Sequence, residues 1–355
     1  MSSVKEIINL YFATHKTCNM NCRYCYVPEY NRFGKKENDN DILHSLEQFI
    51  IKVEDENYAI GSFCLHGSEP SLLSAEALGD AVNMVNEHWN KTGINGYDVA
   101  IQSNGKKLTE SYLLEVLKKI GDSNKLRLGF SIDPPKDVHD FMRDNSFDEV
   151  VHNYYNAINL EFPVSVLSVI SKNTMQDLPG FGEWMKEQLK KKAEKGNPYK
   201  VKIKFATGDS AVNENEIKLF TDFLINEDLL SLPQMFTPGY CIQNGNNCLW
   251  FEFDIYGNCY SCNKAYNNDG IFASWNTDLF DDIMQKRMIL YHDVLRNQEC
   301  FECPYEFLCN SGCPIDRYRE GKMAGKAHEC SMIKQVYGHI LMNTDLHIID
   351  FYNNN

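Results

Sequence analysis

Short runs rich in β-branched and aromatic residues alternate with longer amphipathic segments through the first two-thirds of this 355-residue chain. Strands that alternate with helices favour parallel βαβ units, so the sequence predicts an α/β fold. Six repeats predict a partial (β/α)6 barrel of the TIM type, whose functional residues gather at the C-terminal ends of the strands. The expected strands are Asn9–Thr14, Ser62–His66, Val99–Ser103, Leu126–Ile132, Val164–Ile170 and Val201–Ala206. The expected helices are Asp41–Val53, Ser74–Trp89, Thr109–Ile120, Phe147–Leu160, Phe181–Glu194 and Asn213–Leu230.

The composition changes after about Leu232, where Gly, Asn, Pro and aromatic residues become frequent and the cysteine density rises. This region has little helical or strand periodicity, and small domains of that kind are commonly stabilised by metal. We therefore expect a barrel over residues 1–232, a small metal-dependent domain over 233–340 and a C-terminal tail over 341–355.

The formal net charge of −14 disfavours nucleic acid and anionic membrane surfaces as partners, because both repel an acidic protein. No segment approaches the roughly 20 consecutive apolar residues that a membrane-spanning helix requires. The first residues lack the features of a secretory signal. These observations predict a cytoplasmic protein that binds neither nucleic acid nor membrane.

Thirteen cysteines need an explanation other than disulfide bonds, because the cytosol keeps thiols reduced. Three of them lie within residues 18–25, nine lie between 241 and 330, and Cys64 stands alone. Scattered core cysteines would show no such clustering, so we interpret most of them as ligands of metal or of iron–sulfur clusters.

The first group has the spacing Cys18-x3-Cys22-x2-Cys25 and directly follows the first expected strand. Three thiolates can hold three irons of a [4Fe–4S] cluster and leave the fourth iron open for a chelating molecule. Zinc is the alternative, since soft thiolates also bind zinc and His15 could supply a fourth ligand.

With Tyr24 before its last cysteine, this loop resembles the signature of the radical S-adenosylmethionine (SAM) superfamily. After the second strand, Gly67–Pro70 resembles the family's Gly-Gly-Glu-Pro loop, with Ser68 at the second glycine; the resemblance implies that Glu69 pairs with the SAM ammonium. After the third strand, Gln102–Gly105 is similar to a polar motif that lines the SAM site.

After the fourth strand, Ser131–Asp133 resembles the Ser-Leu-Asp motif of peptide-modifying members, and Arg143 matches an arginine that binds the SAM carboxylate. A surface salt bridge is the alternative role for Arg143. We interpret Asp137, His139 and Asp140 as solvated helix residues. The SAM contacts that the resemblance implies are Tyr24, Gly67, Ser68, Glu69, Asn104, Ser131 and Arg143.

The later cysteines resemble the SPASM domain of radical SAM maturases, which usually carries two auxiliary [4Fe–4S] clusters. The resemblance assigns cluster I to Cys241, Cys248, Cys262 and Cys313, and cluster II to Cys300, Cys303, Cys309 and Cys330. Cys64 is expected in the core, and Cys259 could replace a neighbouring ligand of cluster I. A structural zinc ribbon is the alternative.

The resemblance implies three [4Fe–4S] clusters, and SAM that is cleaved to a 5′-deoxyadenosyl radical, which abstracts a hydrogen atom from the substrate. The leading hypothesis is a maturase that installs a thioether or carbon–carbon cross-link in a ribosomally made precursor peptide. A sulfatase maturase of the formylglycine type is the alternative, although such enzymes place an Asp after a cluster I cysteine where this chain has Asn263. Asp209 and Asp254 are the candidate bases.

Two further hypotheses stay open: a small-molecule radical SAM dehydrogenase and a non-catalytic metal-binding scaffold. The first strand begins by about Asn9, so we expect no winged-helix leader-peptide domain before it, and a separate protein could present the leader. The resemblance also implies an electron donor of the flavodoxin or ferredoxin type.

Overall fold

The computed structural model of this chain describes residues 6–25, 27, 36–96, 99–195, 201–230, 248, 250–262, 270–292, 298–319 and 325–342. The chain forms two compact units. The first contains residues 1–131, 146–165 and 249–287, and the second contains 132–145, 166–248 and 288–355. No described helix is long and apolar enough to cross a membrane.

The first unit is built on an open sheet whose described strands follow the order β4-β3-β2-β1-β7-β8-β9. β1 to β4 and β7 are parallel, and β8 and β9 add an antiparallel edge. The strands are β1 Glu6–His15, β2 Tyr58–Gly67, β3 Val99–Ser103, β4 Leu126–Ser131, β7 Trp250–Asp254, β8 Asn258–Tyr260 and β9 Ile271–Ser274.

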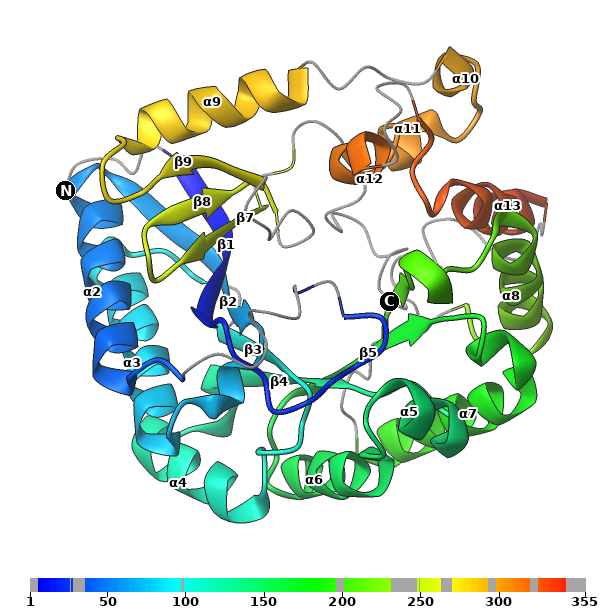
Figure 1. Ribbon diagram of the computed structural model, residues 1–355, viewed down its shortest axis with the longest axis horizontal. Coiled ribbons are helices and arrows are strands. Elements are labelled where there is room, and N and C mark those ends of the chain that lie inside the picture. Colours follow the sequence, from blue (N-terminus) through cyan, green and yellow to red (C-terminus); the bar gives the residue numbers. More distant parts are fainter. Residues whose placement is uncertain are drawn as a thin grey trace. The chain divides into compact units, whose positions relative to one another are not determined.

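Helices that connect the parallel strands cover one face of this sheet, and α2, α3 and α4 lie next to one another there (Figure 1). The aromatic core lies between that face and α2, where Phe12 of β1 and Phe253 of β7 both contact Phe49. Side chains alternate along a strand, so the residues next to Phe12 and Phe253 point to the opposite face. The helices are α2 Asp39–Asp55, α3 Ala75–Thr92, α4 Glu110–Ile120 and α6 Phe147–Asn159.

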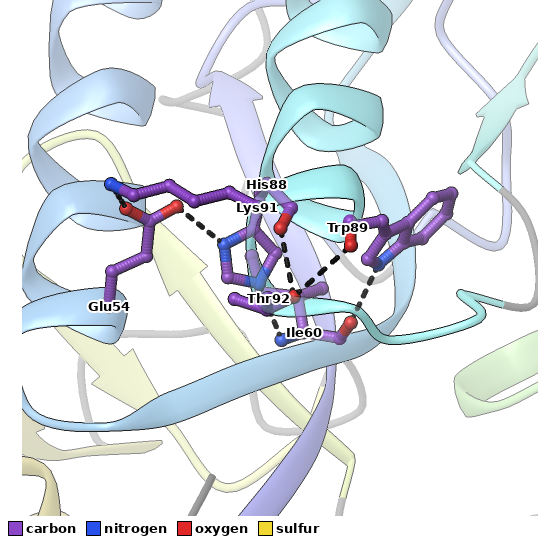
Figure 2. Close-up of polar contacts among 6 residues, drawn as sticks. All are labelled: Glu54, Ile60, His88, Trp89, Lys91 and Thr92. Atoms are coloured by element: carbon purple, nitrogen blue, oxygen red, sulfur yellow. Dashed lines mark hydrogen bonds and ion pairs between the residues drawn. The ribbon is translucent and has the colours of Figure 1, made fainter. Parts of the chain in front are cut away.

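The side chains at the end of α3 bond the backbone of β2 at Ile60, which precedes the first residue paired with β3. The Ile60 N–H donates to His88 Nε2 at 3.0 Å, and Trp89 Nε1 donates to the Ile60 carbonyl at 2.7 Å (Figure 2). His88 Nδ1 therefore carries the proton and donates to Glu54 at 2.9 Å. Burial lowers the pKa of His88, in agreement with a neutral ring.

The second unit contains most of β5 Val164–Ile170 and all of β6 Val201–Phe205, which are parallel. α7 packs on α8 through Phe181 and Phe220, and α13 also contacts α8. Its helices are α5 Lys136–Met142, α7 Leu178–Lys195, α8 Glu214–Asn226, α10 Gln298–Phe301, α11 Glu306–Cys309, α12 Pro314–Arg319 and α13 Cys330–Met342, while α9 Phe280–His292 begins in the first unit.

The structure confirms the α/β class and the six predicted strands, and the sheet is open, as in a partial (β/α)6 barrel. Sequence periodicity missed α5 and all the regular elements after residue 232. The late strands have only three to five residues, too few to show a period, whereas α9 and α13 have 13 residues each and were also missed. The compact units also do not divide at residue 232. β7 extends the sheet beside β1, and α13 buries its apolar residues in the unit that contains α8.

Candidate functional site

The loop that carries Cys18, Cys22 and Cys25 starts directly after β1, in the first unit, and all three thiols are partly buried. The Cys25 N–H donates to the Cys22 carbonyl at 3.2 Å and closes a turn. Cys25 also packs on a small cluster that contains Ala13 and Tyr260. The loop is thereby held on the sheet face opposite the helices.

Backbone geometry at the end of β2 requires glycine at position 67. Gly67 has φ +106°, and a Cβ there would lie 3.1 Å from the His15 carbonyl oxygen and 3.2 Å from the Cβ of Ala13. Ser68, the departure from the family motif, donates from Oγ to the Lys16 carbonyl at 2.8 Å. The Gly67–Pro70 loop is thus bonded to the start of the cysteine loop.

Glu69 is 1% exposed, and its carboxylate links the ends of β2 and β3. Oε1 accepts from the Ser71 N–H at 2.9 Å and from Ser103 Oγ at 2.8 Å, while Oε2 accepts from the Asn104 N–H at 2.7 Å. Because carboxylate oxygens together accept about four hydrogen bonds, these contacts orient the group and leave capacity for a cationic ligand.

Asn104 connects this carboxylate to the cysteine loop. Its Nδ2 lies 3.7 Å from Cys18 Sγ and donates to Asn19 Oδ1 at 2.7 Å. Its own Oδ1 accepts from the Lys106 N–H at 3.0 Å, which fixes the side chain in a turn. The structure therefore brings together Cys18, Ser68, Glu69 and Asn104 from three loops that are separate in the sequence.

The cysteine loop fits a cationic cofactor. The pKa of Cys18 is raised to about 12, first by burial and then by the negative charge of Glu69 and by Cys22 and Cys25. Ionising this thiol therefore requires a compensating positive charge, which iron supplies. No three described His, Cys, Asp or Glu side chains converge on a position for one metal ion. Each thiolate of a [4Fe–4S] cube binds a different iron, so cysteines that hold a cube do not converge on one position.

The residues predicted after β4 lie in buried positions. In the first unit Ser131 Oγ accepts from Gln102 Nε2 at 3.1 Å. In the second unit Arg143 is 5% exposed, and its Nη1 lies 4.0 Å from Asp133 Oδ2, so the surface role considered for Arg143 is wrong.

The interpretation of His139 as a solvated residue is also wrong. Its ring is fully buried, and Nδ1 accepts from the Asp133 N–H at 3.2 Å. Asp137 is exposed and Asp140 is partly exposed, as expected.

All four cysteines assigned to auxiliary cluster II line one pocket in the second unit, together with Lys326 and Lys334. Burial, and then the nearby Cys330, Cys303 and Cys300, raise the pKa of Cys309 to about 11. This thiol, like Cys18, ionises only beside a positive charge, so the donor set fits an iron–sulfur cluster. A single zinc ion would need these thiolates to converge on one point, and no three of the described cysteines do so. The four ligands are Cys300, Cys303, Cys309 and Cys330.

The predicted ligands of auxiliary cluster I are only partly described, because Cys241 lies outside the described residues. Cys248, Cys262 and Cys313 are each partly buried. Cys64 is buried in β2, as predicted, and Cys259 is fully buried in β8. Burial raises the pKa of Cys259, so this thiol behaves as a core residue.

The two candidate bases differ in environment. Asp209 is exposed, in a short 3-10 turn of the second unit. Asp254 is 1% exposed, and its carboxylate accepts four hydrogen bonds, one from Tyr256 in the turn after β7 and three from Asn258 and Tyr260 of β8. These donors fill its acceptor positions, so Asp254 has a clear structural role. Its role as a base stays a prediction, and Asn263 lies outside the described residues.

The structure adds a pair that the sequence patterns did not indicate. His66, the last residue before Gly67, has its Nδ1 3.6 Å from Oε1 of Glu252. Glu252 is fully buried, and His66 is 8% exposed. A charged residue between two phenylalanines in the Trp250–Asp254 run could have marked this position, but only strand pairing brings it next to His66.

The sequence profile of the radical SAM superfamily matches residues 13–185. A cysteine-type anaerobic sulfatase-maturating enzyme of Clostridium perfringens is 24% identical over 338 residues, covering 83% of this chain and 85% of the relative. Among solved structures, native anSMEcpe with bound AdoMet has a TM-score of 0.75 at 18% identity, covering 98% of this chain and 99% of the other. The same protein with AdoMet and a Kp18Cys peptide has a TM-score of 0.74, at 18% identity and 99% and 100% coverage. The structural likenesses establish a shared fold.

Proposed function

This chain belongs to the radical SAM superfamily, and we propose that it is a maturase that oxidises a side chain of a peptide or protein substrate. The observation that carries the proposal is the network around Asn104. One side chain bonds the loop of Cys18, while the backbone of the same residue bonds the carboxylate of Glu69. A SAM molecule chelated at an open iron needs those two elements side by side.

Cys18, Cys22 and Cys25 would hold the cluster, and the loops after β2, β3 and β4 would hold SAM. When bound, this pair supplies a carbon radical that abstracts a hydrogen atom. Glu69 offers its remaining acceptor capacity to the SAM ammonium, Ser68 and Asn104 fix the loops, and the buried surroundings exclude water. Tyr24, Ser131 and Arg143 are further proposed contacts of SAM.

The pocket formed by the four late cysteines supports an auxiliary cluster there, and cluster I remains a proposal from the sequence. Three clusters would let the enzyme pass on the electron that an oxidised substrate releases. A donor of the flavodoxin or ferredoxin type would supply the reducing electron. We retain the cytoplasmic location and a separate leader-binding protein as predictions.

The substrate is proposed to be a peptide with an oxidisable side chain. The similarity to a cysteine-type sulfatase-maturating enzyme favours conversion of a cysteine to formylglycine. Asn263 weighs against that outcome, because an amide cannot act as the base that such maturases place there. A thioether or carbon–carbon cross-link in a precursor peptide is therefore proposed beside it.

The test uses anaerobically purified full-length protein. We expect about twelve irons per chain, about four for each cluster, and release of 5′-deoxyadenosine from SAM under reducing conditions. Changing Cys18, Cys22 and Cys25 together to Ala should remove about four irons and abolish SAM cleavage. Full cleavage in the triple variant would refute the proposal.

Mass spectrometry then separates the two outcomes for the substrate. A cross-linked peptide loses two hydrogen atoms and keeps its sulfur. A formylglycine peptide also loses two hydrogen atoms, and in addition oxygen replaces the sulfur of cysteine. Stoichiometric zinc with little iron in fresh protein would support the metal-binding scaffold instead.

A further inference from the structure

The pair formed by His66 and Glu252 lies on the sheet face that carries the cysteine loop. Phe12 and Phe253 point towards α2, so their neighbours Ala13 and Glu252 point to the opposite face. Ala13 is the register partner of His66, and it also belongs to the small cluster on which Cys25 packs. The pair is therefore close to a predicted ligand of the SAM cluster.

The position within the strands also suits a functional group. His66 is near the C-terminal end of β2 and leads directly into Gly67 and Glu69, which are proposed to hold SAM. Active sites of barrel enzymes are built at this end of the strands. A buried ionisable pair is costly for a fold, so its presence at this end favours a chemical role.

The surroundings of the pair are aromatic. The ring of Tyr11, which is paired in register with Glu252, lies 5.2 Å from the ring of His66 and 4.8 Å from Trp250. The other titratable groups that strand alternation and the described contacts give to this face are Tyr11, Cys25, Cys64, Asp254 and Tyr260. Asp254 and Tyr260 bond each other at 3.0 Å. Glu252 and His66 approach each other to 3.6 Å.

We propose that Glu252 is the catalytic base of this enzyme and that His66 is its positioning residue. This inference rests on the proposed function. When a thiol-bearing side chain is oxidised, the C–H bond breaks and its hydrogen atom goes to the 5′-deoxyadenosyl radical. The S–H bond breaks as the new bond from sulfur to carbon forms; the proton goes to Glu252, and the remaining electron goes to an acceptor of the iron–sulfur class. The substrate loses one hydrogen atom, one proton and one electron both when a thioether cross-link forms and when the thioaldehyde that precedes formylglycine forms.

The chain offers a matched control for this pair. Glu54 and His88 form a second histidine–glutamate contact, part-buried and 2.9 Å long, near the start of β2, where Glu54 also pairs with Lys91 (Figure 2). Glu54→Gln therefore removes a carboxylate from a histidine partner far along the strand from the proposed site. Both variants lose some stability. Their yields of oxidised peptide per 5′-deoxyadenosine differ only if Glu252 has a chemical role.

The experiment measures two products in reconstituted full-length enzyme supplied with SAM, reductant and a synthetic cysteine-containing peptide. Glu252→Gln should still release 5′-deoxyadenosine, but the ratio of oxidised peptide to 5′-deoxyadenosine should fall about a hundredfold, the usual contribution of a general base. Glu54→Gln should keep the wild-type ratio. An unchanged ratio in Glu252→Gln overturns the inference, whereas absence of SAM cleavage in the wild type overturns the proposed function.

A double variant tests the positioning role of His66 in the same reconstituted enzyme. His66→Gln should lower the ratio of oxidised peptide to 5′-deoxyadenosine, and the variant with both His66→Gln and Glu252→Gln should be no worse than Glu252→Gln alone, because a positioning residue acts only through the base. Denaturant unfolding of the same proteins should also give non-additive losses of stability, since the two side chains are in contact. Losses of product ratio that multiply in the double variant would overturn the inference.

Discussion

Asp133 shows how a single residue organises the segment after β4. Its Oδ1 accepts from the Val169 N–H at 2.8 Å, its N–H donates to His139, and Oδ2 faces Arg143 at 4.0 Å. All of these contacts lie in the second unit. They fix Arg143 in a buried position, where its guanidinium suits a carboxylate ligand better than a solvated side chain would.

The buried ring of His139 makes stability depend on pH. Its pKa is lowered to about 3, first by burial and then by the positive charge of Arg143, against an ordinary value near 6.5. The unfolded chain therefore binds a proton below pH 6.5 that the folded chain excludes, and stability falls as the pH drops towards 3. We expect His139 to contribute a loss of about 1.4 kcal/mol between pH 7.5 and 5.5.

Denaturant unfolding of wild-type protein and His139→Asn at these two pH values measures this contribution. The variant should be less stable at pH 7.5, yet lose less stability on acidification. His15, whose pKa burial lowers to about 4, titrates in both proteins and cancels in the comparison. Equal losses of stability on acidification in the two proteins would show that the buried ring of His139 does not cause the pH dependence.

Among the secondary-structure elements, the C-terminal ends of β1 and β2 are in close backbone contact. The register of the two strands shifts between Ala13 and His15, and the chain leaves β2 at Gly67 with φ +106°. The shift allows the Ser68 N–H to reach the His15 carbonyl at 3.3 Å. The two backbones therefore lie close together at the point where the cysteine loop leaves β1 and the Gly67–Pro70 loop leaves β2.

Gly67→Ala should therefore be costly. Its Cβ would meet the β1 backbone in a conformation that L residues rarely adopt, so we expect a loss of about 2–3 kcal/mol together with weaker SAM binding. Gly93→Ala is the control, since Gly93 also has a positive φ but nothing lies within 4 Å of the position that a Cβ would take there. Gly93→Ala should cost about 1 kcal/mol and leave SAM affinity unchanged. Equal costs for both would show that crowding at β1 is unimportant.

For the molecule as a whole, the main question is how the late cysteines serve the reaction that starts at Cys18. Four of them share a pocket in the second unit, while Cys259 is buried in the first unit and Cys64 is buried in β2. The cysteines thus divide into proposed ligands and core residues by burial as well as by spacing.

Cys309→Ala should lose about four irons and still cleave SAM, but should form little oxidised peptide per 5′-deoxyadenosine, because the electron has lost its exit. Cys259→Ala should keep the full iron content and lose only packing energy. Circular dichroism checks that both variants are folded. A folded Cys309→Ala protein that lacks four irons and makes normal product would show that cluster II is only structural.

Local patterns along the chain were enough to predict the six strands β1 to β6, most of the helices between them and the loops that follow these strands. Apolar runs, cysteine spacing and short motifs are local properties, so the positions of Cys18, Gly67 and Asn104 at strand ends could be predicted from the amino-acid sequence, and their roles at a SAM site stay predictions from the resemblance. The short strands after residue 232 could not be predicted in this way, since three to five residues carry too little periodicity.

Which side chains meet depends instead on tertiary packing. The sequence predicts a solvated helix residue at His139, yet the packing of α5 buries it. His66 and Glu252 are separated by most of the chain and become neighbours because β7 pairs with β1, beside β2. Strand pairing between distant segments depends on the burial of whole faces, and no local pattern encodes the partner that a strand will find.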